Sequence, residues 1–197
     1  HVGLADVLGV ARAFRDTDAT TPVVLMGYLN PVEAMGEREF VTRAAASGVD
    51  GVILVDCPPE EMDALDALMK DAGIAPIFLI APTTPDTRIA AIARIARGYA
   101  YYVSLKGVTG AANLDAADVA QHLAAMRRHL RIPIGVGFGI RDAASAQAVA
   151  AHADAVVIGT RLILEMENGP PDAAIARAAT WLATIRSALD AVRKSAA

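Results

Sequence analysis

Two kinds of segment alternate along the chain. Short unbroken apolar runs, rich in Val and Ile, are separated by longer stretches in which Ala, Leu and Arg recur at helical spacing. Unbroken runs of this length are typical of strands buried on both faces, as in parallel sheets. The pattern predicts strands at Pro22–Met26, Gly51–Val55, Pro76–Ile80, Ala100–Ser104, Ile132–Val136 and Ala155–Ile158. It predicts helices at Leu4–Arg15, Arg38–Ser47, Glu60–Ala72, Asp86–Arg97, Ala116–Leu130, Ala143–His152 and Pro171–Arg193, with a short one at Thr160–Met166.

This order is a helix followed by six strand–helix units. Regular alternation of strands and helices indicates either a doubly wound sheet or a (β/α)8 barrel. A barrel has eight strands and about 250 residues, whereas this sequence has 197 residues and opens on a helix with His as its first residue. We expect an α/β fold in one domain over residues 1–197, a (β/α)8 TIM barrel lacking its first two strands. An open six-stranded sheet is the alternative.

Several residues mark the ends of these elements. Gly48 and Gly73 each follow a predicted helix and precede a strand, as a helix C-terminal cap does. Asp115 and Asp142 stand directly before predicted helices, where a carboxylate caps the first turn. Trp181, in the last helix, is expected to belong to the core.

Composition narrows the classes of function. Apolar residues make up 54% of the chain and charged residues 20%, which excludes an intrinsically disordered protein. The formal net charge of −4 argues against a nucleic-acid partner. No apolar run approaches the ~18 residues of a membrane span, so no membrane partner is expected. Cys57 is the only cysteine, which fits a reducing compartment, and we expect a cytoplasmic protein.

Glycine-rich motifs follow the last three predicted strands. They are Lys106–Ala111, Gly135–Ile140 and Val156–Leu162, and the third passes directly into the short helix. In phosphate-binding barrels the site is built by the loops after strands seven and eight and by the N-terminus of a short extra helix. A doubly wound nucleotide fold carries its glycine-rich turn after the first strand instead. The position of the motifs therefore favours a barrel that binds phosphate through backbone N–H groups.

Together with these motifs, other segments make the chain resemble the tryptophan synthase alpha chain family over essentially its whole length. The resemblance rests on Tyr99–Ser104, Gly107–Gly110, Gly137–Ile140, Asp50–Asp56 with Pro58, and Ala75–Pro82. It implies a lyase of tryptophan biosynthesis that cleaves indole-3-glycerol phosphate to indole and glyceraldehyde 3-phosphate by a retro-aldol reaction. It implies no cofactor for this chain. Pyridoxal phosphate is expected only on a partner, the beta chain of an alpha2beta2 assembly.

The resemblance also assigns residues to the substrate. The phosphate would be held by Gly110, Gly139, Gly159 and Thr160, with Phe138 between two of these loops. The Tyr101 hydroxyl would face the glycerol moiety, and Met26 and Ile53 would line the indole pocket. Thr109 would steady the loop after the family's second strand. The loops Leu29–Glu33 and Asp56–Pro59 are candidates for the surface that meets the beta chain.

The sequence offers no residue for the proton transfers of this reaction. The reaction protonates an indole carbon and removes a hydroxyl proton, a task suited to two carboxylates. The family carries them at the end of its second strand and in the following loop, before the point where this sequence begins. We therefore expect this chain alone to be inactive. A glycerol-phosphate-binding regulatory subunit without turnover, or another phosphate-binding TIM barrel of aromatic or histidine biosynthesis, is the alternative.

Other reactive side chains have simpler interpretations. Asp56 reads as a loop-capping or interface carboxylate, and Cys57 as a packed thiol with no base adjacent in sequence. His122 and His129 lie seven residues apart on one predicted helix without Cys or Asp partners nearby, so no metal site is expected.

Overall fold

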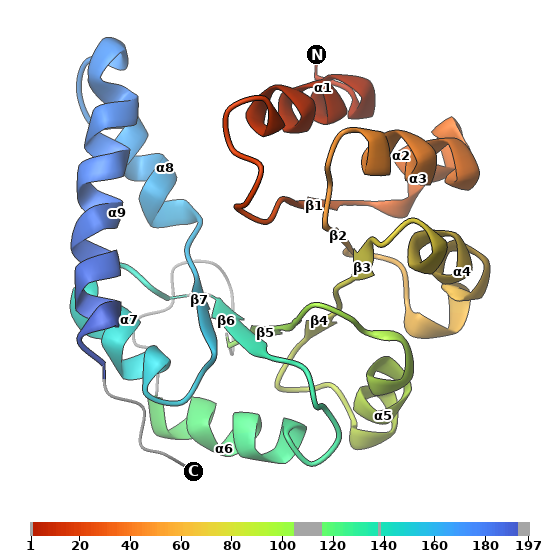
Figure 1. Ribbon diagram of the computed structural model, residues 1–197. Coiled ribbons are helices and arrows are strands. Elements are labelled where there is room, and N and C mark those ends of the chain that lie inside the picture. Colours follow the sequence, from red (N-terminus) through yellow and green to blue (C-terminus); the bar gives the residue numbers. More distant parts are fainter. Residues whose placement is uncertain (1, 105–115, 138, 193–197) are drawn as a thin grey trace. The chain divides into compact units, whose positions relative to one another are not determined.

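The computed structural model describes residues 2–104, 116–137 and 139–192, and the chain divides into two compact units (Figure 1). The first comprises His1–Leu79 and Thr87–Ala100, and the second Ile80–Asp86 and Tyr101–Ala197. None of the helices in these described ranges is long and apolar enough to cross a membrane.

The first unit is a small parallel sheet with helices between its strands. Its sheet has the order β1-β2-β3, and both pairings are parallel. The elements, in chain order, are α1 (Leu4–Arg15), β1 (Val24–Gly27), α2 (Leu29–Met35), α3 (Glu37–Ala46), β2 (Gly51–Leu54), the 3-10 turn η1 (Pro59–Glu61), α4 (Asp63–Asp71) and β3 (Ala75–Pro76). The chain then passes through β4 (Leu79–Ile80) and α5 (Asp86–Ile95) at the boundary between the units.

The second unit repeats the strand–helix alternation. Its sheet has the order β4-β5-β6-β7, with β6 and β7 parallel. The elements are β5 (Ala100–Val103), α6 (Ala116–Met126), β6 (Ile134–Gly137), α7 (Ala143–Ala150), β7 (Ala155–Val157), α8 (Thr160–Glu167), the 3-10 turn η2 (Pro171–Ala173) and α9 (Ala174–Asp190). Helices α8 and α9 lie side by side (Figure 1). The α/β alternation with parallel strands that the sequence predicts is confirmed.

Several predicted features differ from the structure. The single strand expected at Pro76–Ile80 is two strands of two residues in different sheets, β3 beside β2 and β4 beside β5. The predicted helix at Pro171–Arg193 begins with a 3-10 turn and is α-helical only over Ala174–Asp190. Trp181, expected in the core, is half-buried.

Helix α2 is absent from the predicted elements. Pro31 stands in the first turn of α2, where an amide hydrogen has no intrahelical acceptor and proline is tolerated. The segment Leu29–Glu33, expected to be a loop, is therefore helical. The Asp56 carboxylate accepts a hydrogen bond from Leu29 N at 2.8 Å, so this residue caps α2 from the end of the neighbouring strand.

The predicted caps that fall in the described part of the chain are present. Gly48 and Gly73 have φ angles of 76° and 74°, the left-handed conformation that closes a helix. The Asp142 carboxylate accepts from Ser145 N at 2.8 Å at the start of α7, and these hydrogen bonds lower the pKa of Asp142. Asp115 lies outside the described residues.

A carboxylate clamp joins neighbouring strands at their amino ends in each unit. In the first, Asp50 N donates to Val23 O at 2.9 Å while Asp50 Oδ2 accepts from Val23 N at 2.7 Å. In the second, Asp154 N donates to Ile134 O at 3.0 Å while Asp154 Oδ2 accepts from Ile134 N at 2.9 Å. Each ring of two bonds fixes which residues of the two strands are paired.

An arginine from a preceding helix completes each clamp. Arg15 pairs with Asp50 and also donates to Gly48 O at 2.8 Å. Arg127 lies 2.9 Å from Asp154 Oδ2 and 3.1 Å from His152 O. The two units thus use the same triad of an arginine at the end of a helix, a backbone amide at the start of a strand and a carboxylate.

We predict that Asp154→Ala lowers the free energy of unfolding by about 1–2 kcal/mol, because Ile134 N and Arg127 both lose an acceptor. Urea unfolding measures the change. The control is Asp16→Ala, which removes a carboxylate 3.9 Å from Arg12 at an exposed site and should change stability by less than about 0.5 kcal/mol. Equal effects of the two substitutions would contradict the clamp.

Candidate functional site

A hollow in the second unit brings together four of the residues that the sequence assigns to the substrate. Tyr101, Gly139, Gly159 and Thr160 line a cavity of about 120 Å³. The remaining lining residues are Ile140, Val157 and Arg161. Tyr101 lies within β5, and the other lining residues end or follow β6 and β7, so the hollow lies beside the carboxyl ends of these two strands. In α/β folds with parallel strands, ligands bind at this end.

Tyr101 occupies the space that a side chain on Gly137 would fill. A β-carbon built on Gly137 would lie 2.7 Å from Cζ of Tyr101 and would also overlap its hydroxyl oxygen. Along β5 the burial alternates, with Ala100 and Tyr102 covered and Tyr101 and Val103 half-exposed. Tyr101 therefore points to the opposite face from Tyr102, whose ring stacks on His122 at a centroid distance of 5.8 Å.

Tyr102 is a buried tyrosine outside the hollow. Burial, together with the charge of Asp118, raises its pKa to about 12, so it stays neutral at physiological pH. Its ring is part of the packing between β5 and α6, which fixes the direction in which the neighbouring Tyr101 points.

Helix α8 starts at the hollow. Gly159 is its N-cap and Thr160 its first residue, and both are exposed. The Gly159 carbonyl accepts hydrogen bonds from Leu162 N at 2.9 Å and Ile163 N at 3.2 Å, whereas the first amides of a helix have no intrahelical acceptor. Among the described residues, a β-carbon on Gly159 would meet no atom within 4 Å, so no described side chain crowds this residue. The amides and the Thr160 hydroxyl can hold an anion there.

Three of the assigned residues cannot be placed. Thr109, Gly110 and Phe138 lie outside the described residues, as does the rest of the Lys106–Ala111 motif. Gly139, which follows Phe138, has a φ angle of 76°.

The residues assigned to the indole pocket are neighbours in the first unit. Met26 in β1 and Ile53 in β2 are register partners, and partners in parallel strands point to the same face. Ile53 is 3% exposed and Met26 is 60% exposed. Met26 thus exposes an apolar surface, with Ile53 packed beside it.

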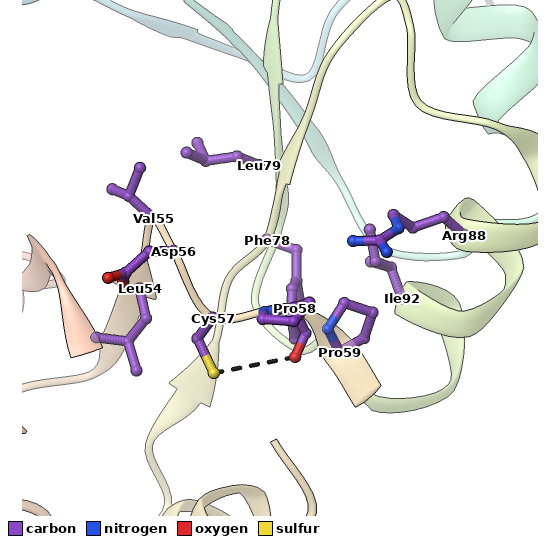
Figure 2. Close-up of a pocket in the computed structure, with 10 residues that line it drawn as sticks. All are labelled: Leu54, Val55, Asp56, Cys57, Pro58, Pro59, Phe78, Leu79, Arg88 and Ile92. Carbon is purple, nitrogen blue, oxygen red and sulfur yellow. Dashed lines mark hydrogen bonds between the residues drawn. The ribbon is translucent and has the colours of Figure 1, made fainter. Parts of the chain in front are cut away.

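A second pocket, of about 290 Å³, lies beside the Asp56–Pro59 loop of the first unit (Figure 2). Its wall is mostly apolar and includes Phe78, Leu79 and Ile92, with the Arg88 side chain from α5 as its cation. Asp56 also lines it, but its carboxylate is engaged with Leu29 N. The interpretation of Asp56 as a capping carboxylate is confirmed.

Cys57, in the same loop, is a packed thiol as expected. Its side chain is buried, and its Sγ lies 3.9 Å from Pro58 O (Figure 2). Burial raises the pKa of Cys57, and nearby carboxylates such as Glu61 and Asp56 raise it further. A thiol in these surroundings stays protonated and is a poor nucleophile. Across the described ranges, no three His, Cys, Asp or Glu side chains are arranged to hold a metal ion.

Arg161 is a lining residue that the sequence analysis missed. Gly159 and Thr160 were expected to bind the phosphate, and backbone groups suffice for that. The signal was available, since Arg161 follows Thr160 directly and stands in the first turn of a helix whose start was predicted to bind an anion.

Comparison with known proteins identifies the family of the chain. The family model described as tryptophan synthase alpha chain matches residues 1–192. The tryptophan synthase alpha chain of Bordetella bronchiseptica is 60% identical over 201 residues, which cover 98% of this chain and 70% of that protein. The corresponding protein of Herminiimonas arsenicoxydans is 56% identical over 190 residues, covering 96% of this chain and 72% of that protein.

Solved structures give the same result. The crystal structure of tryptophan synthase subunit alpha from Legionella pneumophila matches with a TM-score of 0.84 and 38% identity, covering 94% of this chain and 69% of that one. A chain of the tryptophan synthase a2b2 complex from Pyrococcus furiosus matches with a TM-score of 0.82 and 31% identity, covering 94% of this chain and 75% of that one.

We predict that Gly137→Ala lowers the free energy of unfolding by about 1–3 kcal/mol, because the new methyl group displaces the Tyr101 ring. Gly159→Ala is the matched control, since its β-carbon meets no neighbour within 4 Å. In a Tyr101→Ala background the cost of Gly137→Ala should largely disappear. Urea unfolding of the four variants gives the coupling, and an unchanged cost in that background would contradict the packing.

Proposed function

This chain belongs to the tryptophan synthase alpha chain family, and we propose that the hollow in its second unit binds the phosphate of indole-3-glycerol phosphate. The family's members are lyases of tryptophan biosynthesis, and the substrate is cleaved to indole and glyceraldehyde 3-phosphate. The observation that carries the proposal is the meeting of Gly139, Gly159 and Thr160 in one cavity at the start of α8. Membership of this family excludes the alternative of another phosphate-binding barrel of aromatic or histidine biosynthesis.

The arrangement of the hollow suits a glycerol phosphate. Amides at the start of α8 and the Thr160 hydroxyl donate to the phosphate oxygens, where the helix dipole also favours negative charge. Tyr101 lines the same hollow, and its hydroxyl is proposed to face the glycerol hydroxyl groups. Thr109, Gly110 and Phe138 keep the roles that the family resemblance gives them, as proposals.

The apolar end of the substrate needs a different surface. Met26 and Ile53 stand side by side on β1 and β2 and are proposed to line the indole ring. Met26 adapts to flat aromatic surfaces because its side chain is flexible and polarizable. Ile53 holds its place by packing, since it is buried among its neighbours.

Cleavage requires one proton to reach the indole carbon and another to leave a glycerol hydroxyl as the carbon–carbon bond breaks. Of the described residues that line the hollow, none is Asp or Glu. We therefore propose that binding and proton transfer are divided, with the acid and base supplied by segments other than these. The same observation favours the second candidate, a regulatory subunit that binds glycerol phosphate without turnover.

The partner surface is proposed to include α2 and the Asp56–Pro59 loop. Both follow the carboxyl ends of strands, and the Asp56 carboxylate ties them together through Leu29 N. The Pyrococcus furiosus structure is of an a2b2 complex, and we propose that this chain likewise binds a beta chain. Pyridoxal phosphate is assigned to that partner, with no cofactor of this chain's own. The cytoplasm is the proposed location, in keeping with a biosynthetic enzyme and a single cysteine.

We propose a finer assignment of the fold to an eight-stranded barrel. In it β1 and β2 are the third and fourth strands, β3 with β4 is the fifth, and β5, β6 and β7 are the sixth to eighth. The parallel pairings and the structural neighbours support this order. The first two barrel strands then have no counterpart within residues 1–197.

We predict that Gly139→Asp abolishes binding of glycerol 3-phosphate, because it places a carboxylate and a strained side chain at a position with φ 76° beside the anion. Thr160→Ala should weaken binding by about 1 kcal/mol, one neutral hydrogen bond. Thr184→Ala is the control, since its hydroxyl donates to Trp181 O on α9, away from the hollow. Isothermal titration calorimetry measures the affinities, and unchanged binding by the Gly139 variant would place the ligand elsewhere.

We predict further that residues 1–197 release no indole from indole-3-glycerol phosphate while still binding glycerol 3-phosphate. The assay is run with and without a beta chain. Measurable indole release by the pure polypeptide would show that its own residues supply both the acid and the base. Binding without release, in both conditions, is the result expected of the regulatory subunit.

A further inference from the structure

We propose that Arg161 binds the phosphate of the ligand and selects a doubly charged phosphate monoester over a singly charged ester. This inference rests on the proposed phosphate site. Backbone amides can bind either ester, and we assign the discrimination between the two ligand charges to the Arg161 side chain.

Arg161 lies where it can reach an anion bound at the start of α8. It is the second residue of α8, directly after Thr160, and lines the same cavity as Gly139 and Gly159. Arg161 is also the one charged residue among the described residues that line this cavity. An anion held at the start of α8 therefore has this guanidinium as its nearest lining charge.

The guanidinium has unused capacity to donate. One of its terminal nitrogens pairs with Glu165, one turn further along α8. Its Nε is buried and has no hydrogen-bond partner in the described part of the chain. Buried polar atoms are nearly always paired, so this Nε leaves the guanidinium with donor capacity that the described residues do not use. Arginine presents its donors in a fork that matches two phosphate oxygens.

Two neighbours hold the side chain at the cavity. Glu165 is 15% exposed and Arg161 is 41% exposed, so their pair is partly shielded from solvent. The guanidinium carbon lies 6.0 Å from the centre of the Trp181 ring on α9, which limits its movement. Glu165 also compensates part of the Arg161 charge. A ligand with two negative charges gains more from this residual charge than a ligand with one.

The test compares two ligands of the same shape, glycerol 3-phosphate and glycerol 3-sulfate, at pH 8. The phosphate monoester is then a dianion, because its second pKa is about 6, and the sulfate ester is a monoanion. We expect Arg161→Met to weaken binding of the phosphate about tenfold, the value of one charge-assisted hydrogen bond. Binding of the sulfate should weaken no more than about threefold, so that the preference for phosphate falls.

Three further variants test whether the charge of Arg161 causes the preference for phosphate. Arg161→Lys keeps the charge and should restore most of the preference for phosphate. Glu165→Gln removes the compensating carboxylate and should raise phosphate affinity a few-fold. Arg186→Met is the matched control, because Arg186 also pairs with an acid four residues on, Asp190 of α9, yet does not line the cavity.

The outcomes separate this inference from the proposed function. Wild-type protein that binds neither ester would overturn both. Wild-type protein that binds phosphate, with Arg161→Met binding it equally well, would overturn only the role of Arg161. An equal loss for both esters would also overturn it, since that is the effect of a disturbed fold. Thermal melting of each variant confirms that the comparison is made between folded proteins.

Discussion

Strand pairing at the amino ends of the sheets is the constraint on which the rest of the structure depends. The strands have only two to four residues, so few backbone hydrogen bonds define their register. Asp50 and Asp154 help to define it, because each carboxylate accepts a hydrogen bond from a backbone amide at the start of the neighbouring strand, Val23 N just before β1 and Ile134 N in β6. A slip of one residue would turn every side chain to the other face. At the opposite ends of the same strands stand Met26 and Ile53 in one unit, and Gly137, Gly139 and Gly159 in the other.

Much of the fold could be predicted because the helices, strands and caps depend largely on residues that are close together in the sequence. The bounds of α1 agree with the predicted Leu4–Arg15, and the caps at Gly48, Gly73 and Asp142 follow from single residues. The elements that were predicted wrongly depend on contacts between residues that are far apart in the sequence. Helix α2 is stabilised by Asp56, 27 residues away from Leu29, and no local signal announces this. The division of Pro76–Ile80 between two sheets is likewise decided by neighbouring strands.

The candidate site was predictable to a different degree. Glycines at the ends of the last strands indicate close approach of a ligand whatever the details, and Gly139, Gly159 and Thr160 do meet in one cavity. Sequence periodicity does not reveal that Tyr101 needs the space beside Gly137, because the two are 36 positions apart and meet only across paired strands. Arg161 escaped notice for a chemical reason, since a backbone site already accounted for an anion. The structure adds that the Arg161 side chain lines the same cavity as Gly159 and Thr160.

The central claim is that the cavity at the start of α8 receives the phosphate group. A crystal structure of the chain soaked with glycerol 3-phosphate tests it most directly. The account predicts phosphorus density beside the first amides of α8, with phosphate oxygens within hydrogen-bond distance of Gly159 N or Thr160 N and of the Thr160 hydroxyl. Phosphate density at the Asp56–Pro59 pocket with an empty cavity at α8 would contradict it.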